Sequence, residues 1–130
     1  MTGLSIILLY SLITIDTATK WLALAAGIAD EPGILGAIKA IPAAHRARII
    51  DSGALKRGFA SKIITYMILF LAGTILDYVL ENTGNPDFFL HIVVPFLAFT
   101  EFLSIIENLD QAGISVCSGL LNFVKRRLGR

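Results

Sequence analysis

The sequence has a single cysteine, Cys117, only two histidines and few charged residues. One cysteine cannot form an intramolecular disulfide, so a secreted scaffold held by disulfides is excluded. Charged residues make up 16% of the 130 positions, whereas soluble domains carry about 25%. Apolar residues make up 55%, and the mean hydropathy is +0.75. This composition excludes intrinsic disorder and indicates a protein that lies in a lipid bilayer.

The chain also lacks a surplus of charge of one sign and the motifs of common catalytic sites. Eleven Lys and Arg against ten Asp and Glu leave a net charge of +1, which gives no general attraction to nucleic acid. His45 lies among arginines and His91 at the start of an apolar run, so a shared site is not expected. There is no phosphate-binding loop, Cys-x-x-Cys or His-Glu-x-x-His motif. We therefore predict no enzyme, no cofactor and no metal site.

Three long apolar stretches predict membrane-spanning helices at residues 3–28, 59–80 and 88–109. An α-helix crosses a hydrocarbon core of about 30 Å in about 20 residues. Residues 31–57 are too charged to span, and residues 113–128 contain too short an apolar run. Both segments are predicted to form amphipathic helices at the membrane surface, although a plain solvated loop is the alternative for the first. The chain is therefore predicted to be one all-α membrane domain, residues 1–130, with three transmembrane helices.

Two prolines fall inside predicted helices. Pro42 is expected to end or kink the helix in the first surface segment, because proline lacks a backbone N–H and clashes with the preceding turn. Pro95 is expected to bend the third span.

The basic residues gather on one predicted side of the membrane. They lie between the first and second spans (Lys39, Arg46, Arg48, Lys56, Arg57 and Lys62) and after the third (Lys125, Arg126, Arg127 and Arg130). Since basic loops mark the cytoplasmic side, the N-terminus is predicted outside and the C-terminus in the cytoplasm. The turn at residues 81–87 has no Lys or Arg and is predicted outside. The basic segments are also expected to attract anionic lipids.

Lys62 marks the start of the second predicted span and can reach the headgroups. The other five charged residues within the predicted spans are Asp16, Lys20, Asp77, Glu101 and Glu107. A charge at the centre of a spanning helix costs about 2.5–3.5 kcal/mol unless it meets a partner or water. These residues are predicted to line a subunit interface or a wet path, and structural ion pairs within one bundle are the alternative. Lys20 is predicted to approach Glu101, with Asp16 competing for it, because the other basic residues are expected near the surface. Asp77 is expected near the headgroups.

Several of these residues belong to motifs that resemble those of the small holins of Gram-positive phages and clostridial toxin loci. Asp16 to Thr19 resembles an Asp-x-x-Thr-Gly motif, with Lys20 in place of the glycine. Ser52, Gly58 and Lys62 are similar to a Ser…Gly-x-x-x-Lys pattern, and Asp77 matches an acid late in the second span. The most specific match is Glu101 to Asn108, which closely resembles Glu-x-x-Ser-Ile-x-Glu-Asn and includes Ser104, Glu107 and Asn108. Gly113 fits the small residue that follows.

The resemblance covers nearly the whole chain and implies a function. It implies a protein that oligomerises with copies of itself in the bacterial cytoplasmic membrane and permeabilises it to release an endolysin or a toxin. The alternative is a non-conducting membrane scaffold or accessory subunit. A small transporter is disfavoured, because the sequence shows no inverted repeat.

Overall fold

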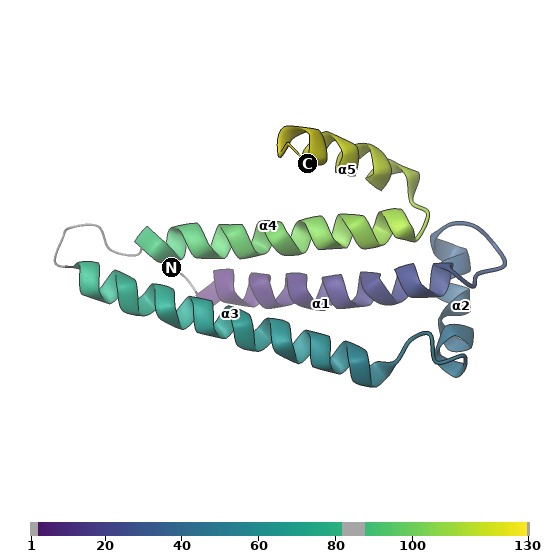
Figure 1. The fold of residues 1–130 in the computed structure, drawn as a ribbon, viewed down its shortest axis with the longest axis horizontal. Coiled ribbons are helices and arrows are strands. Elements are labelled where there is room, and N and C mark those ends of the chain that lie inside the picture. The colour runs from purple at the N-terminus through teal and green to yellow at the C-terminus, as the bar shows by residue number, and fades with distance from the viewer. Residues whose placement is uncertain (1–2, 82–87, 130) are drawn as a thin grey trace.

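The computed structural model describes residues 3–81 and 88–129, apart from the side chain of Val116. The described residues form five helices and no strands (Figure 1). The helices are α1 (Gly3–Ala26), α2 (Ile34–Arg46), α3 (Ser52–Leu80), α4 (Phe88–Gln111) and α5 (Ser115–Arg127). Of these, α1, α3 and α4 are long and apolar enough to cross a membrane. The predicted all-α membrane fold with three spans is therefore confirmed.

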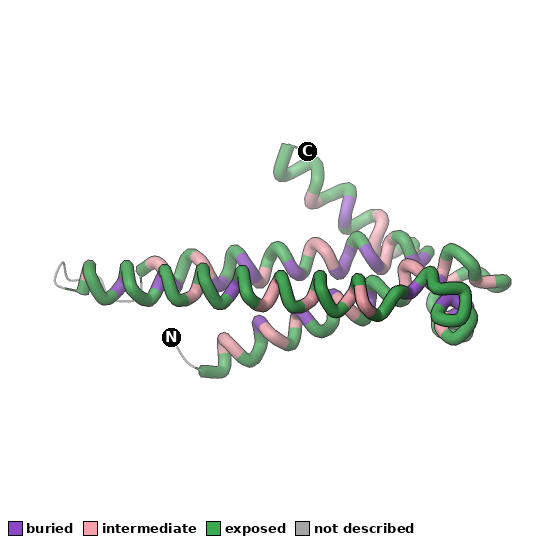
Figure 2. Tube along the Cα trace, turned by 60° about the horizontal axis from the view of Figure 1, so that its bottom comes forward, coloured by how far each residue is buried: buried purple, intermediate pink, exposed green. Residues whose placement is uncertain are grey.

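The three long helices lie side by side and form the body of the molecule (Figure 1). Helix α1 packs against α2, α3 and α4, and α4 also packs against α3 and α5. Much of the surface of the long helices is exposed (Figure 2). It includes large apolar side chains, among them Ile7, Ile68 and Phe96. Only Tyr66, Gly73 and Asp77 of α3 are buried. An apolar exterior of this kind is suited to lipid, and helices satisfy their backbone hydrogen bonds internally as lipid requires.

Helix α2 crosses one end of this bundle nearly at right angles to the long helices (Figure 1). Its buried face is made of small residues, including Ala40 and Ala44, which pack in one apolar cluster with Ala25 of α1. Its outer face exposes Ile34, Leu35 and Ile38. When the long helices cross the membrane, a helix that lies across their ends is parallel to the membrane surface.

The two prolines do not end their helices. Pro42 lies inside α2, so the expectation that it ends the helix is wrong. A proline there removes the donor to the Ile38 carbonyl, but Ile38 and Pro42 are both exposed, so solvent can hydrate that carbonyl. Pro95 lies inside α4, which continues past it to Gln111.

Helix α3 begins earlier than the sequence predicts. It starts at Ser52, whereas the predicted span started at residue 59. The start is fixed by Asp51, whose side chain Oδ1 accepts a hydrogen bond of 2.8 Å from the Gly53 N–H. Residues 52–57, expected in the surface segment, therefore form the first turns of the long helix. Lys62 therefore lies about 15 Å from the start of α3, at about 1.5 Å per residue.

A glycine turn ends α4 and directs α5 back beside it. Gly113 has φ of 86°, a conformation that glycine adopts at low cost. Its N–H donates to the Asp110 carbonyl at 2.9 Å, and the Ile114 N–H donates to the Leu109 carbonyl at 3.1 Å, which is the Schellman pattern of a helix end. Helix α5 then diverges from α4 towards its basic end (Figures 1 and 2).

Gly36 permits the close approach of α2 to the turn before it. A Cβ added there would lie 1.9 Å from the Glu31 carbonyl oxygen, a backbone atom that cannot move independently. We expect Gly36→Ala to displace this turn and to lower the melting temperature of the purified protein in detergent. Overpacking of this kind costs about 1–3 kcal/mol. Gly119→Ala is the matched control, because a Cβ there meets nothing within 4 Å, and an unchanged melting temperature for Gly36→Ala would contradict the expectation.

Candidate functional site

The candidate site is a cluster of charged side chains at one level of the bundle. Asp16 of α1, Lys62 of α3 and Glu101 of α4 each lie about 15 Å from the helix end nearest α2. That depth is about half of a 30 Å hydrocarbon core. The helical rise therefore brings three charges, far apart in the sequence, to the same level along the bundle.

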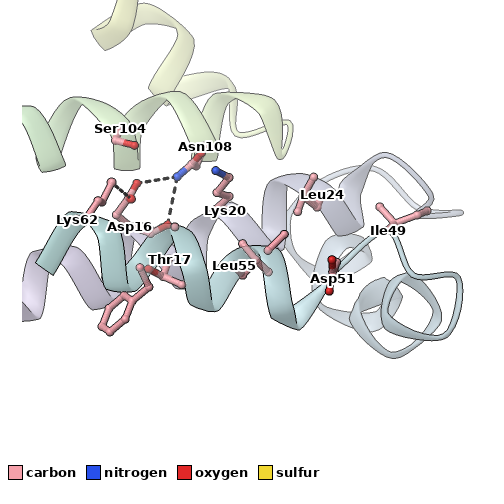
Figure 3. Close-up of a pocket in the computed structure, with 13 residues that line it drawn as sticks. Asp16, Thr17, Lys20, Leu24, Ile49, Asp51, Leu55, Lys62, Ser104 and Asn108 are labelled. Carbon is pink, nitrogen blue, oxygen red and sulfur yellow. Dashed lines mark hydrogen bonds and ion pairs between the residues drawn. The ribbon is translucent and has the colours of Figure 1, made fainter. Parts of the chain in front are cut away.

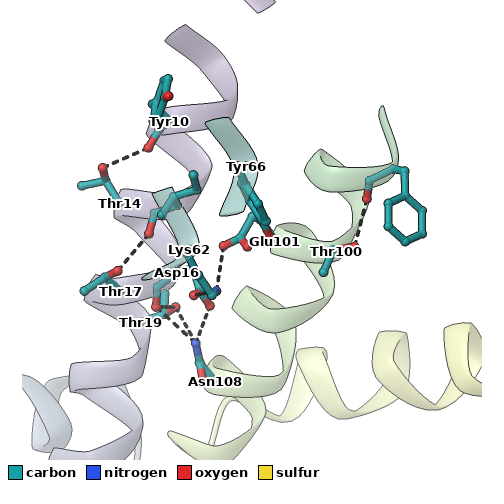
Figure 4. A network of polar contacts seen from close by, with 12 residues as sticks. Tyr10, Thr14, Asp16, Thr17, Thr19, Lys62, Tyr66, Thr100, Glu101 and Asn108 are labelled. Atoms are coloured by element: carbon teal, nitrogen blue, oxygen red, sulfur yellow. Dashed lines mark hydrogen bonds and ion pairs between the residues drawn. The ribbon is translucent and has the colours of Figure 1, made fainter. Parts of the chain in front are cut away.

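Lys62 joins the two acids. Its Nζ lies 2.5 Å from Asp16 Oδ2 and 3.1 Å from Glu101 Oε2 (Figure 4). Glu101 is fully buried and Asp16 is 4% exposed, whereas the Lys62 side chain keeps 36% of its surface. One ammonium group thus bridges two buried carboxylates and ties all three spans together.

Neutral donors complete the hydrogen bonding of both acids. The Tyr66 hydroxyl donates to Glu101 Oε1. Asn108 Nδ2 donates to Asp16 Oδ1 at 2.9 Å and to Thr19 Oγ1 at 3.2 Å. Every oxygen of the two carboxylates therefore accepts a hydrogen bond, and no buried side-chain nitrogen or oxygen among the described residues lacks a partner. The two acids therefore share one lysine, and neutral donors supply their remaining hydrogen bonds.

An apolar layer closes the cluster on the side away from α2. Leu9 and Ile13 of α1, Tyr66 of α3 and Leu97 of α4 form one buried cluster. Ile13, Tyr66 and Leu97 each lie about one helical turn beyond the charged residue of their own helix. This layer separates the charges from the outer half of the bundle.

A cavity opens on the other side of the charges, towards α2. It has a volume of about 350 Å³ and lies between α1, α3 and α4 (Figure 3). It extends from Lys62 to the turn before α3, where Asp51 lies. Its polar lining residues are Asp16, Thr17, Lys20, Asp51, Lys62, Ser104 and Asn108.

A second polar contact joins α3 and α4 at the opposite end of the bundle. The Asp77 carboxylate accepts hydrogen bonds from the Phe89 N–H at 2.7 Å and the Leu90 N–H at 3.0 Å. These are N–H groups of the first turn of α4, which have no acceptor within their own helix. Asp77 is 6% exposed and lies three residues before the end of α3, so its position near the headgroups stays a prediction. It caps α4 from a neighbouring helix.

The predicted approach of Lys20 to Glu101 is also wrong. Glu101 and Asp16 both pair with Lys62, and Lys20 is exposed at the cavity. The prediction failed because it placed the second span from residue 59 and therefore Lys62 at the membrane surface. The earlier start of α3 puts Lys62 at the depth of the acids.

The other predicted interface acid, Glu107, lies outside the cluster. It is 49% exposed and faces Lys125 of α5 at 3.9 Å. An exposed pair at this distance contributes at most about 1 kcal/mol. Within the described part of the chain, the buried cluster therefore contains Asp16 and Glu101 but not Glu107.

The motif residues fall into distinct places. Thr19, Lys62 and Asn108 belong to the hydrogen-bonded cluster, Ser104 and Gly58 line the cavity, Ser52 begins α3, and Gly113 ends α4. The basic surface residues lie at the α2 end and on α5, where Lys39 pairs with Glu31 at 3.0 Å. Arg46, Arg48, Lys56, Arg57 and Lys125 to Arg127 are exposed.

Tyr66 is the cluster residue that the sequence analysis missed. A signal for it exists, because Lys62, Tyr66, Gly73 and Asp77 recur at helical spacing along one face of an otherwise apolar helix. In the structure this face contacts α1 and α4 through Lys62, Tyr66 and Asp77.

These features define a class: a multi-pass α-helical membrane protein whose spans are joined by a buried ionic cluster. The chain belongs to the bacteriophage holin family, whose model matches residues 2–127. The resemblance noted from the motifs is thereby confirmed. Proteins of this family are non-enzymatic membrane pore formers. Comparison with curated proteins and with solved structures gave no match.

Proposed function

We propose that the protein is a holin that associates with copies of itself in the bacterial cytoplasmic membrane and permeabilises it. The lesion releases an endolysin or a toxin from the cytoplasm. Family membership supports the pore-forming role. The observation that carries the proposal is the ionic cluster of Asp16, Lys62 and Glu101 at mid-membrane depth, inside a bundle with an apolar exterior.

The cluster gives a physical route from single bundles to a lesion. In the closed bundle the charges satisfy one another, so the monomer tolerates lipid on all sides. Helix α3 buries only Tyr66, Gly73 and Asp77, and Lys62, Tyr66 and Asp77 make its polar contacts with α1 and α4. Separation of α3 from α1 and α4 would expose Asp16, Lys62 and Glu101, which are costly in lipid and favourable beside water or a second copy. Association of many copies around these faces would yield a water-filled lesion.

Inducible expression in a bacterial host tests this function. We expect a sudden loss of membrane potential, followed by release of a co-expressed cytoplasmic endolysin. Glu101→Gln is the informative variant, since it keeps the side-chain volume and removes one of the two carboxyl groups that share Lys62. It should accumulate in the membrane and change the time of lysis. Accumulation of the wild-type protein without depolarisation would favour the alternative, a non-conducting scaffold.

The proposed topology places the N-terminus outside and the C-terminus in the cytoplasm. We expect reporters fused after Arg130 or placed at Gly53 to face the cytoplasm, because both lie beside the basic segments. A reporter within residues 82–85, which lie outside the described residues, should face outward. Side-specific labelling in intact cells measures this, and cytoplasmic labelling of residues 82–85 would contradict the topology.

Anionic lipids are the proposed partner of the α2 end. Helix α2 exposes Leu35 and Ile38 beside the basic residues, as an interfacial helix does. We expect the joint change of Arg46, Arg48, Lys56 and Arg57 to Gln to weaken contact with anionic lipid, since each basic residue near the surface is worth about 1 kcal/mol. Crosslinking of the protein to anionic and zwitterionic lipid probes measures the difference. Unchanged crosslinking would show that these basic residues do not hold the α2 end against anionic lipid.

A further inference from the structure

The cavity beside the ionic cluster has features that the pore-forming role does not explain. It is open, polar at both ends, and lined by residues from all three spans. Its inner end contains Lys62 and Asp16, and its outer end contains Asp51 at the turn before α3 (Figure 3). A polar cavity of about 350 Å³ has room for several waters, since liquid water occupies about 30 Å³ per molecule.

The cavity has one closed end and one accessible end. Beyond the charges, Leu9, Ile13, Tyr66 and Leu97 pack into a buried apolar layer. Towards α2, the lining residues Ile49, Asp51 and Ala54 are exposed. Water that enters from the α2 side can therefore reach Lys62 and Asp16, and the apolar layer stops it there.

The charged residues that line the cavity balance one another. Asp16 and Asp51 line it with Lys20 and Lys62. At the α2 end, the exposed residues Arg46 and Arg48 lie beside Asp51. Access to the cluster therefore follows from the shape of the cavity and its open end, and not from a net charge of one sign.

We propose that this cavity is a water-filled vestibule through which water and small polar solutes reach the Asp16–Lys62–Glu101 cluster from the α2 side of the membrane only. The vestibule belongs to the single closed bundle and precedes any lesion. It makes the cluster at mid-membrane depth accessible to solutes on one side, while the other side is sealed by apolar packing.

Cysteine accessibility in membrane vesicles tests the vestibule. In a chain whose Cys117 is replaced by serine, Ser104→Cys places a thiol on the cavity lining. Thr100→Cys is the matched control, one turn away on the same helix. Thr100 is exposed on the outside of the bundle and points away from the cluster (Figure 4). Ser52→Cys marks the α2 side and Glu81→Cys marks the opposite side, because both residues are exposed at the ends of α3.

We expect the Ser104→Cys thiol to react with a charged, membrane-impermeant thiol reagent on the side that labels Ser52→Cys. It should not react on the side that labels Glu81→Cys. The Thr100→Cys thiol should stay unreactive, since it faces lipid.

Two results would overturn the vestibule: an unreactive Ser104→Cys thiol, or equal reaction of that thiol from both sides of the membrane. The proposal rests on the closed bundle rather than on lysis, so labelling is done at expression levels below those that depolarise cells. Failure of the protein to lyse cells, with the expected labelling, would contradict the proposed function and support the vestibule.

Discussion

Replacement of Lys62 with alanine is expected to have the largest effect of any single change in the chain. The substitution leaves Glu101, which is fully buried, and Asp16, which is 4% exposed, without their shared cation. Removal of one partner from a buried ion pair costs about 3–5 kcal/mol, and here one lysine serves two acids. We expect Lys62→Ala to lower the protein's melting temperature in detergent strongly and to reduce its accumulation in membranes.

The second half of this test is rescue by removal of the acids. The triple change of Lys62→Ala with Asp16→Asn and Glu101→Gln should be more stable than Lys62→Ala alone, because neutral amides cost less to bury than unpaired carboxylates. Lys56→Ala, on the exposed face of the same helix, is the control for the loss of a lysine. It should change the melting temperature little. Additive effects in this cycle would show that Lys62 is not coupled to the two acids.

Asp77→Ala is expected to have the second largest effect. It leaves the N–H groups of Phe89 and Leu90, in the first turn of α4, without the acceptor that now lies 2.7 and 3.0 Å away. A buried donor without a partner costs about 1–3 kcal/mol. We expect the contact between α3 and α4 to loosen at the end of the bundle away from α2. Hydrogen exchange at the Phe89 and Leu90 amides should increase, and the protein's melting temperature should fall.

Two further variants serve as controls for this test. Asp77→Asn keeps one carbonyl oxygen and should retain part of the cap, so its melting temperature should lie between those of the wild type and Asp77→Ala. Glu81→Gln removes an exposed acid near the same end of α3 and should have no comparable effect. If the Phe89 and Leu90 amides of Asp77→Ala exchanged their hydrogens at the wild-type rate, Asp77 would not be the acceptor that holds the start of α4.

Helix α3 illustrates how a boundary limits prediction from sequence. Its apolar run, residues 63–76, predicts a span correctly, but hydropathy alone places the start at residue 59 and Lys62 beside the headgroups. The cap formed by Asp51 and Gly53 begins the helix at Ser52 instead. A lysine is compatible with a place beside the headgroups and with a place deeper in the bundle, and hydropathy does not distinguish the two. The start of α3 at Ser52 places Lys62 at the same level as Asp16 and Glu101.

The pairing of the buried charges depends on how the helices pack. Local spacing favours Asp16 with Lys20, which are four residues apart on one helix. In the bundle Asp16 and Glu101 both face Lys62 from α3, and Lys20 lies at the cavity. The rotation of each helix about its axis decides whether Asp16 pairs with Lys20 or with Lys62. That rotation is set by packing between the helices, such as the packing of Leu9 and Ile13 with Leu97.

By itself, the sequence determined the all-α membrane fold, the three spans and the family, because apolar runs and the Glu101 to Asn108 motif are local patterns. It also identified Asp16 and Glu101 as charges that need a partner in lipid. Only the tertiary structure decided that the partner is Lys62, that Tyr66 completes the cluster, and that Asp77 caps α4. The physical reason is that each of these contacts joins different helices. Their formation depends on helix depth and rotation, which no local pattern of residues records.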